Sequence, residues 1–386
     1  MYFRRIALAT LVPLALASGA AADDSGGFIV KLGQDTTSVE NYTRTASRVE
    51  VRQVGRAPRT LKRHFVYDLD KTGGVKKFSL VVTPPGSDTA TQTIQGEVGA
   101  DSVMMKIATA GQPVQNLNVA VPKGVVVTAG SSPWVAYEGA IMKLMKGKSD
   151  SLRTTAYFVG STETNWLRLH KLGADSVSIH NSRMDQFHVR VDKSGRILGV
   201  LPIAGTFKVS AERVANVDVD AMANAFVARE KAGAGLGTLS PRDSMKTTVA
   251  GAALHVDYSR PGKRGRVIFG NVVPYGEVWR TGANAATQFR TDKALDFGGT
   301  VLPAGFYTLW TIPAADGWKL IVNSETGQGG TSHKPDKDIA KIDMKVSALL
   351  EPAERFTISI EPAAEGGVLN LDWDTTRASA TFKVVN

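Results

Sequence analysis

The sequence predicts a mainly β protein built from two antiparallel domains. Apolar and polar residues alternate in short segments along most of the chain, as in Arg48–Val54 and Leu254–Tyr258, which is typical of strands with one buried face. Turns rich in glycine and aspartate, such as Ala315-Asp316-Gly317, separate these segments. The length of 386 residues is sufficient for two ordinary domains.

In the N-terminal half we expect an antiparallel β-meander shaped as a half-barrel, with one covering helix near 132–147. Ser132 is a suitable N-cap and Pro133 suits the first helical position. The helix would then bury one apolar stripe, made of Trp134, Tyr137, Ile141, Leu144 and Met145.

A second helix is expected near 218–231, with Asp218 as its cap. Its apolar stripe would be Val219, Met222, Ala223, Phe226 and Val227.

The run Ala232–Gly237 is glycine-rich, which indicates a flexible connection. We therefore predict an N-terminal β-rich domain at 23–231, a linker at 232–245, and a C-terminal domain at 246–386. The short strands of the last part, each followed by a turn, predict an antiparallel β-sandwich of jelly-roll type.

Residues 1–22 have the pattern of a secretory signal peptide. Arg4 and Arg5 precede an apolar run over 6–17, and small residues over 20–22 suit cleavage. The apolar run is short for a membrane anchor, so we expect no transmembrane segment after signal removal. We predict a secreted protein, located in the periplasm or outside the cell.

Composition narrows the function classes. The chain has no cysteine, which excludes disulfides and a cysteine nucleophile. Its formal net charge is +10, which suits polyanions or membrane surfaces as well as an ordinary basic surface. No nucleic-acid-binding motif is present, so we expect no nucleic-acid partner.

The histidines have no standard metal-ligand spacing. His180 and His188 lie on neighbouring β segments and could meet across a hairpin. No catalytic signature of a zinc protease, P-loop or serine hydrolase occurs. We therefore expect neither a cofactor nor a metal.

The stretch Tyr258–Thr287 concentrates arginine, glycine and aromatic residues around one acid, Glu277. Guanidinium groups bind carboxylates and phosphates in a bidentate manner, and Glu277 could act as a general acid or base. The alternative is a structural network in which these arginines pair with acids such as Asp257 and Asp374. The candidate ligand-binding residues are Arg260, Arg264, Arg266, Tyr275, Glu277, Trp279, Arg280, Thr281 and Asn284.

Residues from about Ser240 to Asn386 resemble the bacterial secreted domain-of-unknown-function family 2911. The resemblance rests on Ser259-Arg260-Pro261 with Arg264-Gly265-Arg266, Val273 to Asn284 with Ala286-Thr287, Leu302 to Gly305, Tyr307 to Leu309, Thr311 to Pro313, Trp318, and Trp373-Asp374 with Thr376-Arg377. This sequence departs from the pattern at Gln328–Thr331, where a tryptophan is expected before Gly-Thr. The family has no assigned reaction, so the resemblance implies no catalytic role.

Three functions of different classes remain open. The first is a cell-envelope protein that binds a small polar or anionic ligand in its C-terminal domain. Its N-terminal half resembles in outline periplasmic half-barrels that bind lipids or lipoproteins, which implies an apolar ligand there. The second is a hydrolase that uses Glu277 with neighbouring arginines, and the third is a structural envelope module. We expect Arg260, Arg266, Glu277, Arg280 and Asn284 to converge in space.

Overall fold

The computed structural model describes residues 24–129, 133–182 and 185–385. The predicted signal peptide lies outside these residues. No helix among them has the length and apolar character needed to cross a membrane.

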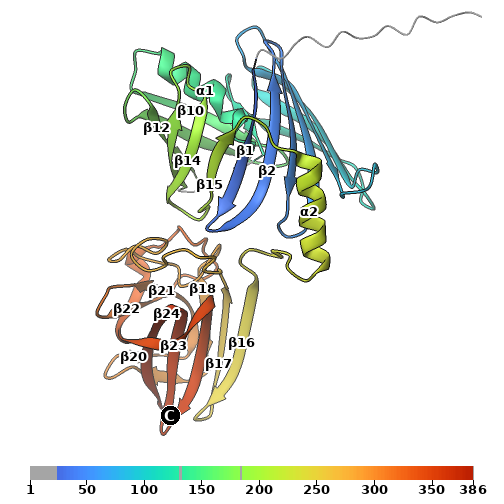
Figure 1. The fold of residues 1–386 in the computed structure, drawn as a ribbon. Coiled ribbons are helices and arrows are strands. Elements are labelled where there is room, and N and C mark those ends of the chain that lie inside the picture. The colour runs from blue at the N-terminus through green and yellow to red at the C-terminus, as the bar shows by residue number, and fades with distance from the viewer. Residues whose placement is uncertain (1–23, 130–132, 183–184, 386) are drawn as a thin grey trace, which may run out of the picture.

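The chain forms two antiparallel sheets, one in an N-terminal lobe (residues 24–231) and one in a C-terminal lobe (residues 242–385), as Figure 1 shows. The fold class is therefore as predicted. The first sheet has fifteen strands in the order β8-β7-β6-β5-β4-β3-β2-β1-β15-β14-β13-β12-β11-β10-β9. The first described strand, β1, thus lies in the middle of this sheet, and among the described strands of the sheet only the short pair β9–β10 is parallel.

The strands of this sheet are β1 (Asp24–Leu32), β2 (Asp35–Arg44), β3 (Arg48–Gly55), β4 (Leu61–Leu69), β5 (Val75–Thr83), β6 (Gln92–Val98), β7 (Ser102–Thr109), β8 (Gln115–Ala120), β9 (Val126–Thr128), β10 (Ser151–Phe158), β11 (Thr164–Lys171), β12 (Ser176–Asn181), β13 (Gln186–Val191), β14 (Ile197–Ala204) and β15 (Ser210–Val214).

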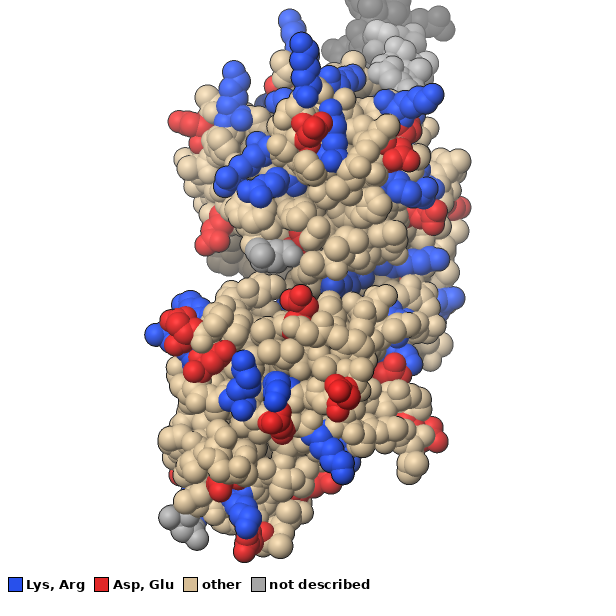
Figure 2. Space-filling model, turned by 90° about the vertical axis from the view of Figure 1, so that its left-hand side faces the viewer, with Lys and Arg blue, Asp and Glu red and all other residues tan. Residues whose placement is uncertain are grey.

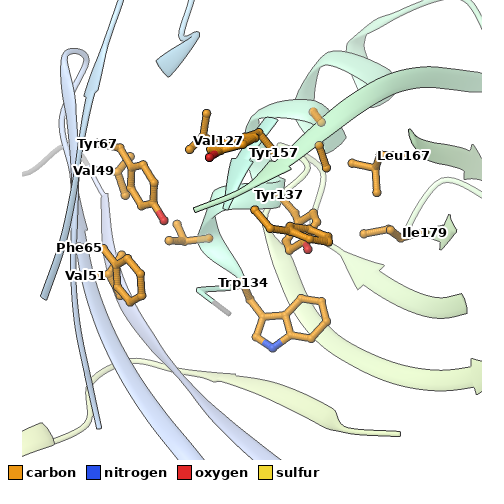
Figure 3. Packing of buried hydrophobic residues seen from close by; sticks show 14 of the residues in the cluster. Val49, Val51, Phe65, Tyr67, Val127, Trp134, Tyr137, Tyr157, Leu167 and Ile179 are labelled. Carbon is orange, nitrogen blue, oxygen red and sulfur yellow. The ribbon is translucent and has the colours of Figure 1, made fainter. Parts of the chain in front are cut away.

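Helix α1 (Val135–Lys146) belongs to the core of this lobe and packs on β9, β10 and β11. In Figure 3, Phe65 and Tyr67 of β4 face Trp134 and Tyr137 across this core. The expected N-cap Ser132 lies outside the described residues, and the structural N-cap is Trp134, whose side chain makes no capping hydrogen bond. The apolar ligand that we expected in this lobe stays a prediction.

One charged residue lies inside the apolar stripe of α1. Glu138 is fully buried and accepts hydrogen bonds from Arg44 (2.7 Å), from Arg213 and from the backbone N–H of Ile197 (2.9 Å). Arg213 also lies over the rings of Phe28 and Tyr42. This network attaches the helix to strands β1, β2, β14 and β15.

Helix α2 (Val219–Lys231) covers the opposite face of strands β2 and β3. Asp218 caps it as predicted, because its Oδ1 accepts a hydrogen bond from the N–H of Ala221 at 2.9 Å. Phe226 then packs with Val39 and Val54 in a small core of its own.

The C-terminal sheet has nine strands in the order β16-β17-β18-β21-β22-β23-β24-β19-β20 and folds around its own core. Trp279, Trp318, Trp373 and Phe356 make ring contacts at the centre of that core. The strands are β16 (Arg242–Val249), β17 (Ala252–Ser259), β18 (Thr287–Thr291), β19 (Ala294–Asp296), β20 (Val301–Leu302), β21 (Gly305–Ile312), β22 (Trp318–Asn323), β23 (Asp338–Ala363) and β24 (Gly366–Val385), with a 3-10 helix η1 (Pro335–Lys337).

The expected linker, 232–245, is not irregular throughout, because β16 begins at Arg242. Within Ala232–Gly237 only Leu236 is buried. Arg56 of the N-terminal lobe donates a hydrogen bond to the carbonyl of Ala234 at 3.0 Å. Whether the two halves fold independently stays a prediction.

We predict that proteases of low specificity cut first within 232–241, because exposed glycine-rich backbone is readily accommodated by a protease. Limited proteolysis followed by mass spectrometry should yield two fragments that each resist further cleavage. First cuts elsewhere among residues 24–385, or rapid loss of either fragment, would contradict the predicted domain boundary.

We also predict that Glu138→Gln lowers the free energy of unfolding by about 3 kcal/mol, because Arg44 and Arg213 lose a buried anionic partner. The matched control is Glu97→Gln, which removes an exposed pair with Lys77 and should change stability far less, because solvent screens exposed ion pairs. Urea denaturation measures both variants. Equal effects would show that the Glu138 network does not hold α1 in place.

Candidate functional site

The two lobes meet where the β1–β2 turn, Gly33–Asp35, contacts the loop around Arg264. The backbone N–H of Gln34 donates to the carbonyl of Arg264 at 3.1 Å. Nη1 of Arg264 lies 2.7 Å from Oδ2 of Asp35. A Cβ atom on Gly33 would lie 2.2 Å from the carbonyl oxygen of Arg264, so only glycine allows this approach.

A cavity of about 270 Å³ lies between the lobes beside this contact. It is named here the cationic cavity, after Lys208 of the N-terminal lobe and Arg264, Arg266 and Arg280 of the C-terminal lobe, which all line it. Trp279, Trp373, Asn284 and the loop Gly205–Val209 complete its wall. In Figure 2 the basic side chains of one face are spread over both lobes among acidic ones, so the cavity is distinct from a general basic surface.

Two of the arginines lie in the loop between β17 and β18 and are held by strand β23 and by the loop itself. The backbone N–H of Arg264 donates to Glu354 at 2.9 Å, and the residue has a left-handed φ of 51°. Arg266 donates to the carbonyls of Lys263 at 3.0 Å and Gly262 at 2.6 Å. Burial lowers the pKa of Arg266, and the nearby charge of Arg264 lowers it further.

Arg280 and Lys208 approach each other from opposite lobes. Arg280 donates from Nη1 to the carbonyl of Gly330 at 3.1 Å, and burial lowers its pKa. Lys208 donates to the carbonyl of Ile203 at 3.3 Å. Burial lowers the pKa of Lys208, and Arg280 adds to that effect.

The loop that carries Lys208 is fixed by a buried acid, Asp185. Its Oδ1 accepts hydrogen bonds from the backbone N–H groups of Thr206 at 2.8 Å and Phe207 at 3.0 Å. Asp185 is only 5% exposed and lies beyond ion-pair distance from Lys208 and Arg280, although its charge acts on both. It therefore positions the loop, and within the described residues the two cations have no direct acidic partner.

A second cavity of about 610 Å³ adjoins the first and shares Lys208, Trp279 and Arg280 with it. Its other lining residues include Ile203, Val278 and Trp310. Glu277 and His333 also line it. His333 has its Nε2 2.9 Å from Oδ1 of Asp338.

The structure brings together part of the predicted site. Arg264, Arg266, Trp279, Arg280 and Asn284 line the cationic cavity. The indole of Trp279 belongs to the core as well, and its Nε1 donates to the carbonyl of Gly282 at 3.1 Å.

The predicted convergence is wrong for Arg260 and incomplete for Glu277. Arg260 instead pairs with Asp243 at 3.1 Å and donates to Thr357 at 2.8 Å. Glu277 lines only the second cavity, is exposed, and forms no hydrogen bond or ion pair within the described part of the chain.

Tyr275 and Thr281 line neither of these two cavities. Tyr275 is 47% exposed, whereas Thr281 is fully buried and donates to the hydroxyl of Thr311. Lys208 was not among the candidates, since it lies in the other lobe and no sequence spacing relates it to Arg280.

Other hollows have a different chemistry. One of about 780 Å³ lies over strands β3–β8, and two ion pairs line it, Arg48 with Asp68 and Lys77 with Glu97. In the described part of the chain, no group of three or more His, Cys, Asp or Glu side chains is placed to hold a metal ion. His180 and His188 are diagonal neighbours across β12–β13, where His188 pairs with Ser178.

Among the solved structures that are similar to part of this chain are two proteins of unknown function, each matched over most of its own length. A DUF1089 family protein from Pseudomonas aeruginosa is 12% identical, covers 43% of this chain and 90% of its own, and has a TM-score of 0.32. A β-barrel-like protein of the domain of unknown function DUF1849 from Brucella abortus is 10% identical, covers 50% of this chain and 98% of its own, and has a TM-score of 0.34.

No curated protein is significantly similar to the chain. A match to a protein family begins close to the first strand of the C-terminal lobe and includes the whole loop that carries Arg264, Arg266 and Arg280. Residues 240–382 match the family described as "Protein of unknown function (DUF2911)".

Proposed function

We propose that this protein binds a small anionic ligand in the cationic cavity between its lobes. The observation that carries this proposal is the state of Lys208, Arg266 and Arg280. Among the described residues, none of the three has a carboxylate within ion-pair distance, and each donates only to backbone carbonyls.

Electrostatics supports an anion in this place. Like charges that are partly removed from water repel each other, because solvent screens them less than at the surface. The Nε atoms of Arg264 and Arg280 are both buried, and no described protein group accepts a hydrogen bond from either. A carboxylate or phosphate offers several acceptor oxygens in a geometry that suits guanidinium groups.

The two alternatives have less support. A hydrolase that depends on Glu277 needs that carboxylate held close to the arginines, whereas Glu277 is exposed and without a polar partner in the described structure. A purely structural module needs its arginines paired with acids. Arg260 and Arg264 fit that description, but Arg266 and Arg280 do not.

The cellular location is part of the same proposal. The signal-like pattern of residues 1–22 supports secretion, so the ligand would be an anion of the periplasm or the extracellular space.

Calorimetric titration with inorganic phosphate at low ionic strength tests the site. We expect Arg280→Met to weaken phosphate binding at least about tenfold, since charge-assisted hydrogen bonds contribute about 1.5–3 kcal/mol. The matched control is Arg260→Met. Arg260 belongs to the same loop but lies outside the cavity, so the affinity of this variant for phosphate should stay within about twofold of that of the unmodified protein. Equal affinities for the two variants would overturn the proposal.

Stability without phosphate gives a second readout on the same site. A lowered pKa means that the folded state holds the proton of Lys208 less tightly than the unfolded state does. The charge of Lys208 therefore opposes folding at neutral pH, and this effect is lost as the pH rises from the lowered pKa of the folded state to the ordinary pKa of lysine. Lys208→Met should raise the free energy of unfolding by about 0.5–1 kcal/mol without phosphate, and saturating phosphate should remove that advantage.

A further inference from the structure

The second cavity differs from the cationic cavity in the chemistry of its walls. Ile203 of β14 and Val278 of the opposite lobe line it together with Val272, Pro274 and Trp310. Ile203 is 52% exposed and Val278 is 41% exposed. Apolar side chains of both lobes thus face water in one hollow, and exposed apolar surface in a cavity commonly marks a ligand or partner site.

The two cavities share part of their walls. Lys208 and Arg280 line both cavities, as do the apolar residues Val272, Val273 and Trp279, so a ligand that spans both cavities passes these two cations. Glu277 also lines the second cavity and is exposed, which disfavours a second anionic group there. A ligand that fits both cavities therefore has one anionic end and one apolar end.

We propose that the ligand is a single-chain amphiphile with a carboxylate head, of the chemical class of a medium- or long-chain fatty acid. Its carboxylate binds Arg280 and Lys208, and its acyl chain lies in the second cavity between Ile203 and Val278. This inference rests on the proposed anion site and adds the class of ligand. Charge complementarity with the cations sets the head at the cationic end. The volume of about 610 Å³ lies within the usual range for small-molecule sites.

The test is a chain-length series on the full chain, with acetate, octanoate and dodecanoate below their aggregation concentrations and phosphate as the probe of the anion site alone. Each buried methylene should tighten binding roughly fourfold, as expected for transfer of CH₂ from water. The double variant Ile203→Ser with Val278→Ser should weaken the binding of dodecanoate at least about tenfold. It should leave the affinity for phosphate unchanged. Both side chains are exposed, so this variant is expected to fold. The control Val301→Ser changes a valine that is 55% exposed and lies outside both cavities, and it should bind like the unmodified protein.

The outcomes separate the two proposals. If phosphate binds but the affinity for carboxylates does not depend on their chain length, the proposal of an amphiphilic ligand is wrong and the proposal of an anion site is retained. Tight dodecanoate binding that the double variant does not weaken would place the chain elsewhere and also overturn this inference. If neither phosphate nor any carboxylate binds, both the proposed anion site and the proposal of an amphiphilic ligand are wrong.

Discussion

The contact between the turn Gly33–Asp35 and Arg264 is the constraint on which the site depends. Arg264 is 8% exposed, accepts a hydrogen bond from Gln34 and pairs with Asp35 across the boundary between the lobes. This contact sets the N-terminal lobe on the loop that also carries Arg266 and Arg280. If it were absent, Lys208 would not face Arg280, and neither cavity would have both of its walls.

Buried charge is treated differently in two parts of the molecule. In the N-terminal lobe, Glu138 forms ion pairs with two arginines, and the resulting network holds α1 inside the core. At the boundary between the lobes, Arg264 pairs with an acid, but in the described part of the chain Arg266, Arg280 and Lys208 donate only to backbone carbonyls. Folding alone does not favour this second arrangement, because partly buried cations lose hydration without gaining a counter-charge. Such an arrangement is common where a binding or catalytic site lowers the stability of the folded protein.

Much of the fold follows from local pattern. Alternation over segments such as Arg48–Val54 indicated strands, and the cap at Asp218 indicated the start of α2, since both signals depend on near neighbours. Glu138 shows the limit of this reasoning, because an acid on an apolar stripe is explained only by Arg44 and Arg213 of distant strands.

The site was predictable only in part for the same reason. The arginine-rich loop was recognisable in the sequence, but which arginines share a cavity depends on how the loop turns. Arg260 is directed to Asp243 and Thr357, and Glu277 stays at the surface. Lys208 is placed opposite Arg280 by docking of the lobes, and no feature of the sequence near either residue predicts that meeting.

The arrangement of the lobes can be measured directly because the chain has no cysteine of its own. A Cβ built on Gly265 lies 3.5 Å from Cβ of Gln34, which is within the range that a disulfide spans. The double variant Gln34→Cys with Gly265→Cys should therefore crosslink under mild oxidation, despite a cost of about 1 kcal/mol for a cysteine at positive φ. The control Gln34→Cys with Gly299→Cys, which uses the turn before β20, should not. Mass spectrometry after alkylation quantifies the bond. Near-complete crosslinking of the first pair, with phosphate binding retained, is the predicted result, and failure to crosslink in the folded protein would contradict the docking that creates the site.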